Sequence, residues 1–189
     1  SSIVNMLYNT QLMRLAGADG VAAYGAVMYV NFIFVATFLG YAIGCAPVIS
    51  YHYGAGNHAE LKNLYKKSMS IILVWGVILF GAAQLLAPVL SKIFVGYNTG
   101  LYAMTLHGFR VYAIAFLIIG INIFGSSFFT ALNNGLISAV ISFLRTLVFQ
   151  VIMVLTLPLW FGINGIWSAI SIAEALTLIM TTTFFVRQK

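Results

Sequence analysis

The chain has 189 residues, of which 62% are hydrophobic and 6% are charged. Soluble domains carry about 25% charged residues and disordered chains are poor in apolar residues, so both classes are excluded. The composition is that of an integral membrane protein. The net charge of +6 does not indicate a nucleic-acid partner, because the basic residues lie mainly at the ends of apolar segments.

Apolar segments in chain order predict an all-α protein with one partial and five complete membrane helices. The partial segment, 1–13, is shorter than the ~20 residues that a crossing needs, so we expect the sequence to begin inside a helix of a longer protein. The complete segments are 21–45, 68–90, 106–130, 136–158 and 163–186. Charges, glycines and asparagines separate them. The chain is therefore predicted to form a single lobe over 1–189, with its first helix truncated.

The basic residues predict the orientation of the lobe. One end carries five of them: Lys62, Lys66 and Lys67 in an expected loop at 54–67, and Arg187 and Lys189 at the C-terminus. The other end carries three: Arg14, Lys92 and Arg110. Basic residues favour the cytoplasmic side. We therefore expect loop 54–67 and the C-terminus to be cytoplasmic.

Two stretches of the sequence resemble one half of a multidrug and toxic compound extrusion (MATE) transporter. The first holds Gly40 and Gly44, then Pro47, and ends in Gly54-Ala55-Gly56-Asn57 before the basic segment. The second is the sequence LPLWFGINGIW at 157–167, followed by Ala173-Glu174. Neither motif is catalytic, but their order and spacing agree with the helices counted above.

The resemblance implies a twelve-helix protein in two lobes, of which this chain would be the C-terminal six-helix lobe. It implies export of cationic or amphiphilic drugs and toxic compounds from the cell, across the plasma membrane, in exchange for H⁺ or Na⁺ by alternating access. The expected partners are small amphiphilic cations, the lipid bilayer and the missing N-terminal lobe. The resemblance implies no cofactor besides the coupling ion.

Two ionisable residues are expected deep inside the membrane, where charges are costly and often functional. Glu174 is the one carboxylate well inside a predicted span, and Arg145 lies about nine residues into the preceding span. Glu174 is a candidate carrier of the coupling ion. Because both residues are expected at similar depth on consecutive antiparallel segments, a structural ion pair is the alternative, and we favour it.

Uncharged side chains are further candidates for a substrate or ion site. The polar candidates are Asn9, Gln11, Asn31 and Asn122. For Asn31 and Asn122, a hydrogen bond between helices is the alternative role. Tyr112 and Phe116 could bind aromatic cations through cation–π contacts, or simply pack against other helices. Family members often place coupling carboxylates on the first or fourth helix of a lobe. This sequence has none there, so the ion site could lie in the missing part.

Two other functions remain open from the sequence. A lipid-linked glycan flippase of the same superfamily is one, although such proteins tend to line their cavity with several cations. A membrane scaffold subunit without transport activity is the other. We predict no enzyme and no metal site, because the sequence lacks HExxH and GxSxG motifs and has a single cysteine, Cys45.

Overall fold

A computed structural model describes residues 2–187. These residues form seven α-helices and one π-helix, and the described range contains no strand. The elements are α1 (Ser2–Gly54), α2 (His58–Val95), α3 (Thr99–Ala113), α4 (Phe116–Ala131), α5 (Gly135–Phe143), η1 (Leu144–Val148), α6 (Phe149–Phe161) and α7 (Ile163–Arg187). The expected all-α fold is confirmed.

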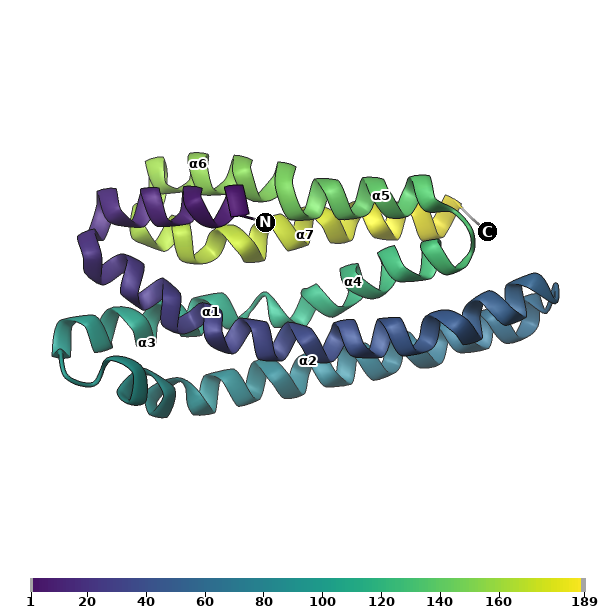
Figure 1. Cartoon of the computed structure of the whole chain (residues 1–189), viewed down its shortest axis with the longest axis horizontal. Helices are drawn as coiled ribbons and strands as arrows, with labels where there is room; N and C mark the ends of the chain where they lie inside the picture. Colours follow the sequence, from purple (N-terminus) through teal and green to yellow (C-terminus); the bar gives the residue numbers. More distant parts are fainter. Residues whose placement is uncertain (1, 188–189) are drawn as a thin grey trace.

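The helices run roughly along one long axis (Figure 1). The first part of α1 lies near α6 and α7, and its second part lies against α2 and α4 (Figure 1). The turn between α1 and α2, the turn between α4 and α5, and the end of α7 all lie at one end of the molecule (Figure 1). The basic segment after Gly54 therefore lies at the same end as Arg187. This agrees with the sequence, in which an even number of predicted spans separates the two places. Lys189, which was counted with them, lies outside the described residues.

Gly17 divides α1 into two segments. Its backbone is non-helical, with φ 65° and ψ −154°, a region that is essentially restricted to glycine. An expected break at 14–20 is thus a kink at one residue, with helix on both sides. The chain reverses direction there (Figure 1), so the partial first segment packs back along the lobe.

Three asparagines begin the helices that follow the tight turns. The side chain of Asn57 accepts from the backbone N–H of Glu60 at 3.1 Å, and Asn98 accepts from Leu101 at 3.1 Å. Asn134 accepts from Ile137 at 3.4 Å. A side-chain oxygen at this position satisfies an N–H that the first helical turn leaves free.

These caps explain a correction to the expected loops. The segment expected as loop 54–67 is helical from His58 onward, and the break expected near 91–105 is reduced to residues 96–98. Charged residues mark where a helix leaves the hydrocarbon, but they do not end the helix. Lys62, Lys66 and Lys67 therefore lie on the first turns of α2, not in a loop.

The expected helix at 106–130 is also corrected, because it is two helices. Helices α3 and α4 form an angle of 47° at residues 114–115. At this point Ile114 and Ala115 donate to carbonyls three residues earlier instead of four, with N···O distances of 3.3 and 3.0 Å. The tighter turn tilts α4 away from the axis of α3.

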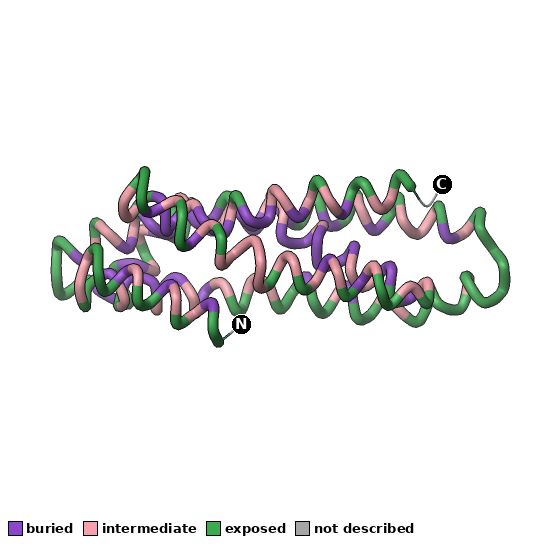
Figure 2. Tube along the Cα trace, turned by 90° about the horizontal axis from the view of Figure 1, so that it is seen from above, coloured by how far each residue is buried: buried purple, intermediate pink, exposed green. Residues whose placement is uncertain are grey.

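Apolar side chains cover much of the outer surface. Figure 2 shows exposed residues along the whole length of the outer helices. Four helical stretches are long and apolar enough to cross a membrane: Ser2–Gly54, His58–Val95, Gly135–Phe161 and Ile163–Arg187. In an apolar segment of 18 residues from each stretch, only 11% to 33% of the residues are buried. Phe32, Ile43 and Leu85 are each more than 60% exposed. A surface of this kind is suited to lipid and not to water.

Candidate functional site

A buried ion pair joins α7 to η1. Glu174 of α7 is 1% exposed, and the side chain of Arg145 in η1 is 17% exposed. The Arg145 Nε lies 2.8 Å from Glu174 Oε1 and 3.1 Å from Oε2. The pairing expected from their matching depths is therefore confirmed. Among the described residues it is the only ion pair within 4.0 Å.

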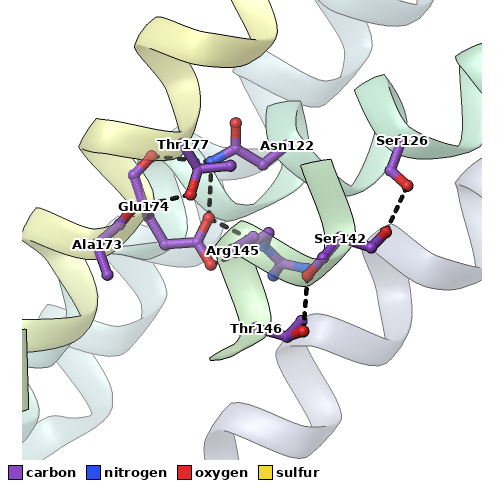
Figure 3. Close-up of polar contacts among 8 residues, drawn as sticks. All are labelled: Asn122, Ser126, Ser142, Arg145, Thr146, Ala173, Glu174 and Thr177. Carbon is purple, nitrogen blue, oxygen red and sulfur yellow. Dashed lines mark hydrogen bonds and ion pairs between the residues drawn. The ribbon is translucent and has the colours of Figure 1, made fainter. Parts of the chain in front are cut away.

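Asn122 of α4 completes the site from a third helix. Its Nδ2 donates to Glu174 Oε2 at 2.7 Å and to the backbone carbonyl of Glu174 at 2.9 Å. Figure 3 shows the carboxylate turned toward both Arg145 and Asn122. Three elements that are distant in sequence therefore meet at a single carboxylate. Charge-assisted hydrogen bonds of this kind are shorter and stronger than those between neutral groups.

Arg145 lies within the π-helix. The backbone N–H of Phe149 donates to the carbonyl of Leu144, five residues earlier. A π-turn inserts one residue into an α-helix and shifts the side chains that follow, and such turns are frequent at functional sites. No glycine or proline lies in Leu144–Val148, so the sequence contained no local signal for this turn.

Hydroxyl groups fix α5 beside α4 close to the ion pair. Ser126 Oγ lies 2.9 Å from Ser138 Oγ and 2.7 Å from Ser142 Oγ, and Thr130 Oγ1 lies 2.6 Å from Ser138 Oγ. Figure 3 shows Ser126 and Ser142 next to η1. Sequence reasoning missed these residues. Their spacing of four, in Ser126 and Thr130 and in Ser138 and Ser142, is a signal that could have found them.

The two aromatic candidates lie in the core. Tyr112 is 5% exposed and Phe116 is 2% exposed, and their ring centroids are 6.0 Å apart in an edge-to-face arrangement. Neither presents a face to a ligand in this structure. Their observed role is to pack α3 against α4, next to Phe34 of α1.

The remaining polar candidates are scattered. Asn31 is half-buried and its Oδ1 has no hydrogen-bond partner among the described residues. Gln11 is half-buried on the first part of α1, whereas Asn9 is exposed there and lines an open hollow of about 780 Å³. Of the predicted site residues, the structure thus brings together Glu174, Arg145 and Asn122. The described residues hold no group of three His, Cys, Asp or Glu side chains placed to bind a metal.

Comparison with solved structures identifies the fold. An inward-facing multidrug resistance MATE family transporter of the MOP superfamily matches 99% of this chain with a TM-score of 0.92 and 20% sequence identity. A MOP superfamily transporter from Pyrococcus furiosus also matches 99% of it, with a TM-score of 0.89 and 20% identity. The chain spans 43% and 42% of these two proteins, respectively.

Comparison of sequences gives two further matches. The lipid II flippase MurJ of Bacillus subtilis (strain 168) is 31% identical over 98 residues, which are 51% of this chain and 18% of the flippase. The MatE protein-family model matches residues 1–156, well over half of the chain. The chain therefore belongs to the MatE family, as a multi-pass membrane protein whose fold is that of about two-fifths of a MATE transporter.

Proposed function

We propose that this chain is the C-terminal lobe of a secondary active antiporter in the plasma membrane. The whole protein would export cationic or amphiphilic compounds in exchange for H⁺ or Na⁺, and this lobe would form one wall of the transport cavity. The observation that carries the proposal is the match over 99% of the chain to MATE family transporter structures, one in an inward-facing and one in an outward-facing conformation. The turn at 55–57 and the end of α7 would face the cytoplasm.

The ion pair defines the role of Glu174 within this function. Its carboxylate accepts from both Arg145 and Asn122, so release of these contacts would have to accompany every binding of H⁺ or Na⁺. A permanent structural pair requires no such cycle. We therefore assign Glu174 to holding α4, η1 and α7 together, and place the coupling group elsewhere in the transporter.

A lipid-linked glycan flippase is the second candidate. The sequence identity of 31% to a lipid II flippase over half of the chain favours it. A flippase of this type needs unpaired cations to bind a pyrophosphate. Arg145, the least exposed cation among the described residues, is engaged by Glu174 and is not free for that role, which weakens the case for a flippase. A scaffold subunit without transport activity is the third possibility and predicts no transport at all.

Reconstitution of the intact transporter into liposomes tests the proposal. A fluorescent amphiphilic cation and a fluorescent lipid-linked pyrophosphate are offered in parallel, under an imposed H⁺ gradient, an imposed Na⁺ gradient or none. The antiporter predicts gradient-dependent movement of the amphiphile. Movement of the pyrophosphate lipid alone would favour the flippase, and movement of neither would favour the scaffold.

A further inference from the structure

A hollow on the first part of α1 is lined by polar side chains, methionines and an arginine. Neither the ion pair nor the packing of the helices accounts for these exposed residues. The hollow measures about 780 Å³, and its lining includes Asn5, Met6, Asn9, Thr10, Met13 and Arg14. Val21, which follows the kink at Gly17, closes one side. The opposite face of the same helix is packed, with Val4, Tyr8 and Leu12 each no more than 3% exposed.

The polar half of this lining is poorly suited to contact with hydrocarbon. Asn9, Thr10 and Arg14 are all exposed on a helix that lies alongside membrane-spanning helices. Polar groups and charges in contact with hydrocarbon cost several kcal/mol each, and such residues face protein or a water-filled cavity. The hollow is therefore on the side of the lobe that faces water or the rest of the transporter.

Hydrogen bonds within the lobe leave donors of Asn5 and Arg14 free in the hollow. Asn5 Oδ1 already accepts from the hydroxyl of Tyr24 at 3.3 Å, which leaves the Asn5 amide nitrogen. The hydroxyl of Thr10 donates to the carbonyl of Met6 at 2.8 Å. Arg14 adds a guanidinium with five N–H donors and no acceptor. The Asn9 amide and the Ser2 hydroxyl each have both a donor and an acceptor available, and the Thr10 oxygen remains an acceptor.

Among the described residues, no carboxylate forms an ion pair with Arg14. The chain has three acidic residues. Glu174 is engaged by Arg145, and Glu60 lies near the turn between α1 and α2 at the far end of the molecule. Asp19 follows the kink and makes no ion pair with Arg14 within 4.0 Å among the described residues. The hollow therefore combines one positive charge with several hydrogen-bond donors.

The apolar part of the lining is adaptable. Met6 and Met13 are 65% and 56% exposed at the hollow. Methionine side chains are flexible and polarisable, and they are common on surfaces that bind varied apolar molecules. An apolar body of variable shape could lie along these thioethers while its polar end reaches Arg14.

We propose that the hollow binds amphiphiles whose polar end is anionic, with a carboxylate or phosphate held by Arg14. This inference rests on the proposed function and narrows its substrate class to amphiphiles that carry an acidic group, zwitterions included. A guanidinium suits both anions because its paired N–H groups match two oxygens. A purely cationic compound would be repelled by Arg14 at this position.

Binding of matched probes to the intact transporter in detergent tests the proposal. Four probes share one dansyl-alkyl body and end in a carboxylate, a phosphate monoester, a hydroxyl or a trimethylammonium group. We expect either anionic probe to bind at least tenfold more tightly than the trimethylammonium probe, and the ratio between the two anions identifies the preferred acid. Arg14→Gln should weaken binding of the preferred anionic probe by about ten- to a hundredfold, as loss of a charged hydrogen bond predicts.

Two further variants control this result. Arg14→Lys keeps the charge and should retain most of the binding. Arg110→Gln removes an exposed cation on α3, outside the hollow, and should leave all four affinities unchanged. Binding of the hydroxyl probe should be the same in all variants, which shows that the hollow is still folded.

The proposal is overturned if the trimethylammonium probe binds as tightly as the anions, or if Arg14→Gln leaves the anionic probes unaffected. Failure of the proposed function is a separate result. If the cation is transported under a gradient but anions do not bind through Arg14, the antiporter proposal stands and the proposed binding of anionic amphiphiles in the hollow is rejected. Arg14-dependent anion binding without any gradient-driven transport would reject the antiporter and retain the proposed binding.

Discussion

Arg145 and Glu174 form a salt bridge of 2.8 Å between a π-helix and the last α-helix, in a lobe whose surface is largely apolar. The same carboxylate accepts a hydrogen bond of 2.7 Å from Asn122 of α4. Three helices are thus connected at one buried carboxylate (Figure 3).

Glu174→Gln should destabilise the lobe strongly. The substitution leaves the guanidinium of Arg145 buried without its counter-ion, and loss of one partner from a buried pair costs about 3–5 kcal/mol. Thermal unfolding of the detergent-solubilised protein measures the loss. Glu60→Gln is the matched control, because Glu60 bonds to Asn63 near the end of the molecule and has no cation within 4.0 Å among the described residues.

Gly17→Ala should strain the kink in α1. The backbone of Gly17 has φ 65° and ψ −154°, and a residue with a Cβ in this region costs about 1–3 kcal/mol. Space is not the reason, because a Cβ at Gly17 would meet nothing within 4 Å. The midpoint of thermal unfolding should therefore fall.

Gly25→Ala is the control for the kink. Gly25 also has no atom within 4 Å of an added Cβ, but it lies inside the regular helix after the kink. Alanine there should be neutral or slightly stabilising, since glycine weakens a helix by about 0.5–1 kcal/mol. Equal effects at the two glycines would show that the kink does not depend on the conformation of Gly17.

Much of this fold could be predicted from the sequence, because a long apolar segment indicates a membrane helix. Segments such as 163–186 were placed almost to the residue, since α7 runs from Ile163 to Arg187. The pairing of Arg145 with Glu174 was also predictable, because two opposite charges at equal depth on neighbouring helices have few other partners. Asn122 was predicted as a polar candidate, but its contact with Glu174 was not.

The missed features depend on tertiary packing. The bend between α3 and α4 falls at Ile114 and Ala115, which are ordinary helix residues. Close contacts on either side supply a reason: Gly108 lies against Trp167 of α7, and Gly120 lies against Phe38 of α1. Helices α3 and α4 both pack on α1, α2 and α7, so these close contacts constrain the helix on each side of the bend. The π-turn at Arg145 likewise has no local breaker, and the hollow near Arg14 emerges only when the chain reverses at Gly17.

Cysteine labelling tests the orientation. In a Cys45→Ala background, His58→Cys and Tyr97→Cys place single thiols at exposed positions on opposite ends of the lobe. An impermeant maleimide added to intact cells should label the thiol at position 97 and not the one at position 58, because the basic end is expected to be cytoplasmic. Labelling of position 58 alone would invert the proposed topology. Permeabilised cells, in which both thiols should react, provide the control.

Gradient-driven transport by the Glu174→Gln/Arg145→Gln double variant is the most direct test of the central claim, that the ion pair holds the lobe together and does not carry the coupling ion. Both neutral side chains can hydrogen-bond to each other, so the melting temperature should recover most of what either single variant loses. The account predicts that export driven by H⁺ or Na⁺ recovers with it. A double variant with normal thermal stability and no gradient-driven export would contradict the account and assign ion coupling to Glu174.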